Sequence, residues 1–225
     1  MTATRSVSRH KYIPLLHEAD YVMDLGRKIG VTDDKIIPEL FLTSEEKSSA
    51  VERLKQKGIN PSDTILAMNP SSGNSVPNWT PERYVELIVS LSRKYQIVVN
   101  VSPKDVELEE MLKPILRPGI AIDKGNLREL MALCSIVNVL ISSSTGTMHI
   151  AAALGTPTVS LFCPLTACSP QLWGPLGNKA EVILPEPDYC QIRCPKDPKI
   201  CPLEDIEIPT VVQRIETILD ASKKK

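Results

Sequence analysis

The chain has 225 residues, of which 42% are hydrophobic, and its formal net charge at pH 7 is -1. A chain of this length and composition can bury a real hydrophobic core, so we expect a soluble, folded protein. The near-neutral charge gives no field that would attract nucleic acid, and an aromatic content of 4% leaves few rings for stacking bases. We therefore expect no nucleic-acid partner.

The sequence also predicts where the protein resides. The first thirty residues contain no apolar run of signal-peptide length, and no stretch approaches the ~18 apolar residues of a membrane span. We therefore predict a cytoplasmic protein. The lysine tail 223–225 is expected to be solvated, and peripheral contact with an anionic membrane is the most that it would make.

Helix and strand patterns alternate along the chain. A helix is predicted at residues 10–28, with one apolar stripe formed by Tyr12, Leu15, Leu16, Ala19, Val22 and Met23. Thr43 to Glu46 is a capping-box sequence that opens a helix ending near Gly58. Further patterns predict strands at 64–68, 96–101, 119–122 and 137–141, and helices from Pro81, at 105–116 and at 127–135. Repeated strand–helix units predict an α/β fold with a doubly wound parallel sheet, whose ligands bind beyond the carboxyl ends of the strands.

The segment from Ser142 to Phe162 is the most informative part of the chain. It has the pattern of a strand end, a turn of small residues, a short helix beginning near Thr147 and a further strand, with Gly155 and Pro157 ending the helix. Unpaired amides and the positive end of the helix dipole would point above the turn, which favours a phosphate. A turn of small residues is also what tight packing between a strand and a helix requires.

This segment is similar to the signature of the bacterial family 9 glycosyltransferases, the heptosyltransferases of lipopolysaccharide core synthesis. The similarity includes Gly146 three residues before His149, an alanine-rich helix, and Trp173-Gly-Pro175 farther on. Upstream, Asn69-Pro-Ser-Ser-Gly73 and Trp79-Thr-Pro-Glu-Arg83 resemble the family's Asn-Pro-Gly turn and its Trp-Pro helix start.

The resemblance implies a domain organisation and a reaction. Family members have two Rossmann-like domains of the GT-B type, and the likeness here covers the carboxyl-terminal domain, roughly residues 60 to 220. We therefore expect residues 1–58 to be a helical linker or remnant and 59–225 to be the nucleotide-sugar-binding domain. The implied reaction transfers a sugar from a nucleotide sugar, ADP-heptose by resemblance, to a lipopolysaccharide core acceptor, with no cofactor and no metal.

The resemblance also implies a set of residues that bind the nucleotide sugar. The candidates are Ser72, Gly73, Ser144, Thr145, Gly146, Thr147 and His149. Each has a structural alternative, because His149 could cap or pack, the turn at 144–147 could serve packing alone, and the turn at 72–73 could be an ordinary loop.

Three departures from the family pattern bear on activity. The family's catalytic base lies in its first domain, so we assign no catalytic residue in this chain. Ser144 stands where the family has an acidic residue, and Pro77 stands where it has a lysine near the diphosphate. Loss of that cation would cost on the order of several kcal/mol of transition-state stabilisation, unless Asn74 or Lys104 compensates for it.

Other function classes therefore remain. The chain could be a non-catalytic nucleotide-binding module, or half of a split transferase that needs a first-domain protein partner. A nucleotide-sugar epimerase is disfavoured, because the sequence lacks both Gly-x-Gly-x-x-Gly and a Tyr-x3-Lys pair. Asp105 and Glu107 follow the strand predicted at 96–101, where a ribose-binding carboxylate would be expected, but a solvated helix start is the favoured explanation for each of them.

Three cysteines cluster near the carboxyl end, at Cys190, Cys194 and Cys201. Three thiols suggest zinc, but the spacing contains no CxxC pair and no histidine lies nearby, so we expect no metal. Free thiols are expected in a reducing cytoplasm.

Overall fold

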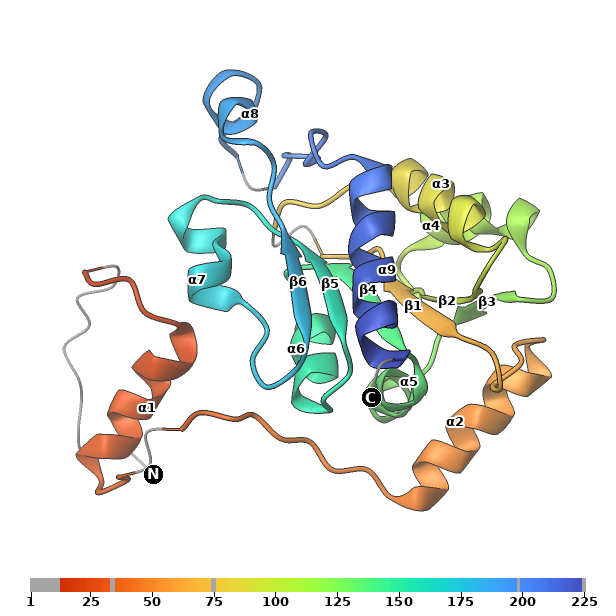
Figure 1. Ribbon diagram of the computed structural model, residues 1–225, viewed down its shortest axis with the longest axis horizontal. Helices are drawn as coiled ribbons and strands as arrows, with labels where there is room; N and C mark the ends of the chain where they lie inside the picture. Colours follow the sequence, from red (N-terminus) through yellow and green to blue (C-terminus); the bar gives the residue numbers. More distant parts are fainter. Residues whose placement is uncertain (1–12, 33–34, 74–75, 198, 224–225) are drawn as a thin grey trace.

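A six-stranded parallel sheet forms the centre of the protein (Figure 1). The computed structural model describes residues 13–32, 35–73, 76–197 and 199–223. The strands are β1 (Ile65–Asn69), β2 (Gln96–Asn100), β3 (Ile120–Asp123), β4 (Val139–Ser143), β5 (Thr158–Leu161) and β6 (Ala180–Ile183). Their order is β3-β2-β1-β4-β5-β6, and each neighbouring pair is parallel. This order confirms the doubly wound Rossmann-like fold and puts its topological switch point between β1 and β4.

Helices connect the strands and cover both faces of the sheet. They are α1 (Glu18–Lys28), α2 (Ser44–Gln56), α3 (Pro81–Leu91), α4 (Val106–Leu112), α5 (Leu127–Ile136), α6 (Gly146–Ala153), α7 (Pro170–Trp173), α8 (Pro187–Ile192) and α9 (Ile208–Lys223), with the 3-10 turns η1 (Lys113–Ile115) and η2 (Thr166–Cys168). No helix within these described residues is both long and apolar enough to cross a membrane.

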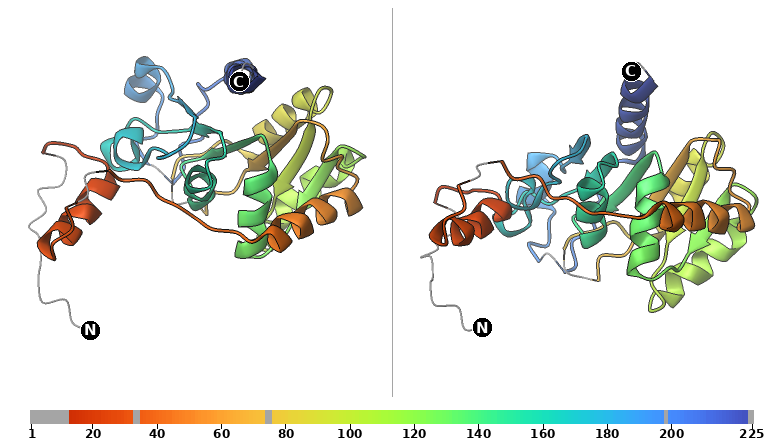
Figure 2. Two further views of the ribbon diagram at one scale, coloured as in Figure 1. Left: turned by 60° about the horizontal axis from the view of Figure 1, so that its bottom comes forward. Right: turned by 90° about the horizontal axis from the view of Figure 1, so that it is seen from below.

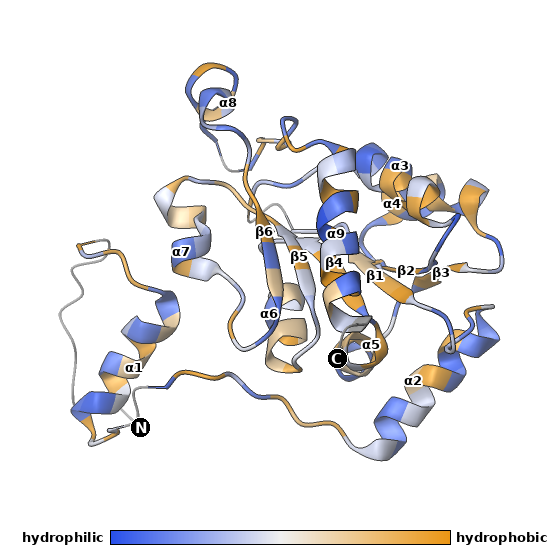
Figure 3. Ribbon diagram, viewed as in Figure 1, coloured by the Kyte–Doolittle hydropathy of each residue, from blue (hydrophilic) through white to orange (hydrophobic). Residues whose placement is uncertain are grey.

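The core lies in two layers, one on each face of the sheet. In β1, Leu66 and Met68 pack with residues of α3, α4 and α9, whereas Ile65 and Ala67 pack with residues of α2, α5 and α6. All five residues of β1 are buried, as expected of a central parallel strand. Polar and apolar residues alternate along α2 and α9, which cover opposite faces (Figure 3).

Helix α1 stands apart from these layers (Figure 2). It is held near α7 by two hydrogen bonds: His17 Nε2 donates to the Gly174 carbonyl at 2.9 Å, and Gln171 Nε2 donates to the Leu15 carbonyl at 2.9 Å. Among the residues of α1 itself, Tyr21 is the buried one.

The helix predicted at 10–28 is therefore wrong at its start. The observed helix begins at Glu18, because the His17 ring caps it by accepting a hydrogen bond from the Ala19 amide. Of the predicted stripe, Tyr12 lies outside the described residues, and Val22 is 55% exposed rather than buried.

Other element boundaries shift by one or two residues, and one helix is broken. The helix predicted at 105–116 ends at Leu112 and continues as η1, since Pro114 has no amide to donate to the helix. The strand predicted at 137–141 is Val139–Ser143, and the helix predicted from about Thr147 begins at Gly146.

The region predicted to be a linker contributes one helix to the core. Leu54 of α2 is fully buried, and Arg53 pairs with the buried Asp123 at the end of β3. The Leu40 amide donates to the Ala153 carbonyl at 3.3 Å, which fixes the extended segment before α2 against α6. The division of the chain between residues 58 and 59 stays a prediction.

Candidate functional site

The carboxyl ends of β1 and β4 meet at the switch point of the sheet. Asn69 is in register with Ser142, so the turns that follow these strands start side by side. The Asn69 side chain links them, because its Oδ1 accepts from Thr147 Oγ1 at 3.3 Å and its Nδ2 donates to the Ser71 carbonyl at 2.9 Å. Asn100 Nδ2 donates to the same Oδ1 at 2.7 Å, which extends the network to β2.

Helix α6 begins with an open amino terminus. Thr145 is its N-cap, but the hydroxyl makes no capping hydrogen bond. Within the described residues, the amides of Gly146 and Thr147 meet no protein acceptor, whereas the next two amides bond to the Thr145 carbonyl. Gly146 is exposed, and a Cβ built on it has nothing within 4 Å. This end of α6 thus has two amides without a protein acceptor in the described structure and open space beside Gly146, which suits an anion.

Two buried hydroxyls accompany these amides. The oxygens Ser143 Oγ and Thr145 Oγ1 are shielded from solvent and have no partner in the described structure. An unpaired buried hydroxyl costs free energy, of the order of 1–3 kcal/mol. Ser144, between them, is half-buried.

His149 lies one turn into α6. Its ring is half-buried, and burial, together with the nearby His17, holds the pKa of the imidazole below its ordinary value of 6.5. The ring is therefore biased toward the neutral form in the protein without ligand. An anion above the turn would favour the imidazolium instead.

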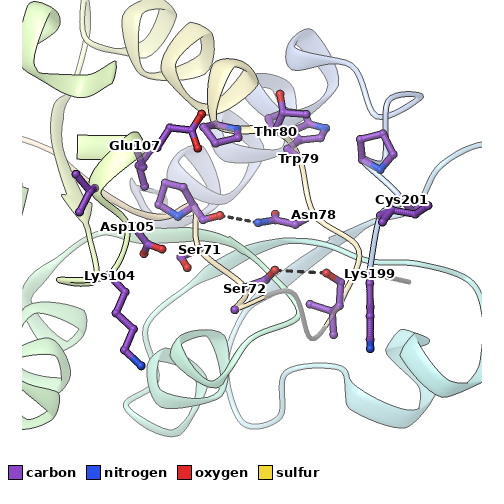
Figure 4. A pocket seen from close by; sticks show the side chains of 18 residues that line it. Ser71, Ser72, Asn78, Trp79, Thr80, Lys104, Asp105, Glu107, Lys199 and Cys201 are labelled. Atoms are coloured by element: carbon purple, nitrogen blue, oxygen red, sulfur yellow. Dashed lines mark hydrogen bonds between the residues drawn. The ribbon is translucent and has the colours of Figure 1, made fainter. Parts of the chain in front are cut away.

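A pocket of about 470 Å³ lies beside the β1 turn (Figure 4). Its walls come from the turn after β1, the starts of α3 and α4, and a segment near the carboxyl end of the chain. The lining includes Ser71, Ser72, Gly73, Asn78, Trp79, Thr80, Lys104, Asp105, Glu107, Lys199 and Cys201. The pocket is thus at the carboxyl edge of the sheet, next to the α6 terminus but not lined by it.

Charged side chains of both signs line this pocket. Lys104 and Lys199 are exposed, lie on opposite sides of Ser72 in Figure 4, and form no ion pair within the described residues. Asp105 has one buried oxygen, Oδ2, that lacks a partner among the described groups. Glu107 is exposed at the start of α4.

The structure assigns the predicted site residues to two adjacent groups. Ser72 and Gly73 line the pocket, with Gly73 in the left-handed region at φ 59°. Ser144, Thr145, Gly146, Thr147 and His149 form the α6 terminus and are joined to the β1 turn through Asn69. Pro77 is buried and carries no charge to the site, whereas Lys104 is present in the pocket and Asn74 lies outside the described residues.

Sequence reasoning missed the asparagines that organise this edge. Asn69 is 4% exposed and is the polar residue that ends the otherwise apolar β1, a signal in the sequence that could have identified it. Asn78 Nδ2 donates to the Pro70 carbonyl, and its Oδ1 accepts from Tyr84 Oη at 2.8 Å. Trp79 is buried against Tyr84, with ring centroids 5.6 Å apart.

Metal-ligating side chains do not converge in the described residues: no three of His, Cys, Asp or Glu are arranged to hold an ion there. All six cysteines are free thiols. The side chains of the lysine tail 223–225, predicted to touch a membrane at most, lie outside the described structure.

Comparison with known proteins identifies the family. The model of glycosyltransferase family 9 (heptosyltransferase) matches residues 7–200. Lipopolysaccharide heptosyltransferase 2 of Salmonella typhimurium is 31% identical over 164 residues, which are 69% of this chain and 45% of that protein. The chain spans about half the length of the curated relatives that it matches.

Solved structures share the fold. A family 9 glycosyltransferase from Veillonella parvula is 25% identical, with a TM-score of 0.77 over 95% of this chain and 62% of that one. An E. coli heptosyltransferase solved with ADP-2-deoxy-2-fluoro heptose is 15% identical, with a TM-score of 0.59 over 96% of this chain and 59% of that one, and supports the fold alone. Since the family model spans most of the chain, this chain belongs to glycosyltransferase family 9, the heptosyltransferase family.

Proposed function

We propose that this chain is the nucleotide-sugar-binding half of a glycosyltransferase of the heptosyltransferase type. The donor would be an ADP-heptose-type nucleotide sugar and the acceptor a lipopolysaccharide core, in the cytoplasm. Family membership supports the reaction class, and a family 9 relative of the same fold was solved with an ADP-heptose analogue. The observation that carries the proposal is the open amino terminus of α6.

In this proposal the diphosphate lies above the α6 terminus. The free amides of Gly146 and Thr147 donate to it, and the hydroxyl of Thr145 gains the partner that it lacks. Ser144 adds a neutral hydroxyl, and His149 adds an imidazolium when it is protonated. The turn at Ser72 and Gly73 contacts the same ligand from the neighbouring strand.

The chain's own residues would stabilise the leaving group. As the acceptor hydroxyl attacks the anomeric carbon, the bond to the nucleoside diphosphate breaks and negative charge grows on the departing phosphate. Donors already aimed at that phosphate stabilise the charge without reorganising, which is commonly the largest catalytic effect. Lys104 and Lys199 line the adjacent pocket, form no ion pair within the described residues, and would supply positive charge that Pro77 does not.

The general base is not assigned to this chain. The family resemblance implies that the base is a carboxylate of the first domain, and none of the residues at 144–149 is acidic. We propose that a facing domain, in the same protein or in a protein partner, supplies it. The second candidate function is nucleotide binding without turnover, which the neutral Ser144 and the buried Pro77 favour.

The decisive experiment compares Gly146→Asp with its neutral isostere Gly146→Asn in calorimetric titrations with ADP and UDP. Both side chains fit, because a Cβ at residue 146 meets nothing within 4 Å. We expect saturable binding by the wild type, a loss of affinity of about tenfold or more in Gly146→Asp, and a loss of at most about threefold in Gly146→Asn, because only aspartate repels the phosphate.

Circular dichroism and thermal unfolding would show that both variants fold. Equal losses in the two variants would indicate a steric effect and remove the phosphate from this terminus. Absence of binding by the wild type at millimolar nucleotide would contradict the proposal for this chain. Binding without sugar transfer, when a first-domain protein and an acceptor are added, would favour the non-catalytic module.

A further inference from the structure

Three thiols gather beside the pocket, in the segment that forms its carboxyl-terminal wall. Cys190 lies in α8, Cys194 lies two residues beyond that helix, and Cys201 lines the pocket itself. Cys194 Sγ and Cys201 Sγ are 3.8 Å apart, in hydrogen-bond contact. Tyr189 Oη also lies 3.8 Å from Cys201 Sγ.

The separation of Cys194 and Cys201 suits reversible bond formation. A disulfide bond is ~2.05 Å long, so the two sulfurs need to approach by less than about 2 Å. Both residues lie outside helices and strands, so the approach requires no break in the sheet or in α8. The amide of Lys196 donates to Cys194 Sγ at 3.4 Å, which holds the thiol in its present orientation.

The two thiols differ in accessibility, and this difference gives them separate roles. Cys194 is half-buried, whereas Cys201 is 4% exposed. Burial raises the pKa of the Cys201 thiol, and burial together with the neighbouring thiols raises the pKa of the Cys190 thiol. We therefore expect an external oxidant to react first with Cys194, and the buried Cys201 to react with the product.

The pair is coupled to the turn after β1 by a short hydrogen-bonded path. The Asn78 amide donates to the Cys201 carbonyl at 3.2 Å. The Asn78 side chain donates in turn to the Pro70 carbonyl, directly before Ser71 and Ser72. A shift of Cys201 toward Cys194 would therefore displace Asn78, whose side chain holds the turn at Ser71 and Ser72.

We infer that Cys194 and Cys201 form a redox-active dithiol, which closes into a disulfide on reaction with a low-molecular-weight disulfide such as oxidised glutathione and reshapes the pocket. The Cys194 thiolate attacks glutathione disulfide, forms a mixed disulfide and releases one glutathione thiolate. The Cys201 thiolate then attacks Cys194 Sγ and releases the second. The two cysteines lose two protons and two electrons, and two glutathione thiols are formed.

The test uses the full chain, equilibrated in glutathione buffers from fully reduced to fully oxidised and then quenched by alkylation. We expect the wild type to lose two alkylatable thiols and to give one peptide pair linked through Cys194 and Cys201. Cys190→Ser is the matched control and should behave like the wild type. Cys194→Ser should form no intramolecular disulfide, and Cys201→Ser should stop at a glutathione adduct on Cys194.

Amide hydrogen exchange then tests the effect on the pocket. Oxidation should speed hydrogen exchange at the Asn78 amide by roughly tenfold, because formation of the disulfide would strain its hydrogen bond to the Cys201 carbonyl. The exchange rates of amides in α5 should not change. A bond between Cys190 and Cys194, or only glutathione adducts, would overturn the dithiol. Unchanged exchange at Asn78 in the oxidised chain would overturn the coupling. Neither readout requires nucleotide, so the inference is independent of the proposed function.

Discussion

Helices α5 and α6 both begin at the carboxyl edge of the sheet, but only α5 has a closed amino terminus. Asn126 Oδ1 accepts from the Glu129 amide at 3.1 Å, and Glu129 Oε2 accepts from the Asn126 amide at 2.7 Å. Thr145 makes no such bond at the start of α6, and its hydroxyl is buried without a partner in the described structure. The start of α5 is capped by its own side chains, whereas the start of α6 has no side-chain cap in the described structure.

The same difference separates other helices of the chain. Helix α2 has a full capping box, formed by Thr43 and Glu46. Helices α3 and α4 follow β1 and β2, and their N-caps, Thr80 and Asp105, make no side-chain capping bond and line the pocket. The starts of α3, α4 and α6, which have no side-chain cap, therefore lie around the switch point, where doubly wound sheets bind ligands, although α8, after the edge strand β6, also lacks such a cap.

The largest expected effect concerns a buried carboxylate that is fully paired within the fold, in contrast to the unpaired polar groups at the start of α6. Asp123 ends β3, is fully buried, and accepts from Arg53 Nε at 3.1 Å and Lys57 Nζ at 2.9 Å. Asp123→Asn leaves two cations facing a neutral amide, so we expect the free energy of unfolding to fall by about 3 kcal/mol. Urea unfolding measures the loss.

A matched control for Asp123→Asn is Glu216→Gln, which removes the carboxylate of the exposed pair with Lys94. Its loss should be below about 1 kcal/mol. Nucleotide affinity should be unchanged in both variants under native conditions. Equal losses in the two variants would mean that the Asp123 cluster is no more important to folding than a surface pair.

The next, smaller effects come from variants that compare the start of α5 with the start of α6. Asn126→Ala should lower the free energy of unfolding by about 1 kcal/mol and leave nucleotide binding unchanged, because it removes a working cap. Thr145→Val keeps the side-chain shape and removes a buried hydroxyl that has no partner in the described structure, so we expect the free energy of unfolding to rise, by on the order of 1 kcal/mol. It should nevertheless weaken ADP binding by roughly fivefold, the value of one hydrogen bond. Thermal unfolding and calorimetry measure the two quantities.

The opposite pattern would overturn the comparison. If Thr145→Val destabilised the protein as much as Asn126→Ala, the Thr145 hydroxyl would be a cap in solution and the α6 terminus would be closed.

The helix starts that carry a side-chain cap were largely predictable from sequence, because capping interactions are local. The capping box predicted at Thr43 is confirmed, and the one at Asn126 is of the same kind, since each joins residues three positions apart. The helix predicted at 10–28 shows the limit of periodicity, since an apolar stripe does not say what covers it. Val22 of that stripe is exposed, and the start depends on the His17 ring.

The α6 terminus and the pocket depend instead on contacts between segments that are distant in sequence. Asn69 meets Thr147, 78 positions away, and Asn100, 31 positions away, so no local pattern reports their meeting. The pocket combines the turn after β1 with Lys199 and Cys201, which only the tertiary fold brings together. The local sequence made Thr145 and Gly146 candidates for binding an anion, but it could not show that the Thr145 hydroxyl and the Gly146 amide have no protein partner in the described structure.

The smallest effect concerns protons at the open helix start. Burial holds the pKa of His149 below 6.5 in the free protein, and a bound diphosphate would raise it by favouring the imidazolium. Binding of ADP below pH 6.5 should therefore take up a fraction of a proton, and ADP affinity should rise as the pH falls through this range. Calorimetry in buffers of different ionisation enthalpy measures the uptake, and His149→Gln should abolish its largest part. In the protein without nucleotide, acid has the opposite effect and lowers stability. The unfolded chain binds the proton more readily than the folded chain, so the contribution of His149 to stability is present above pH 6.5 and is lost as the pH falls through the lowered pKa. Proton release on binding, or equal uptake in His149→Gln, would exclude His149 from contact with the phosphate and restrict the anion site to the turn that precedes it.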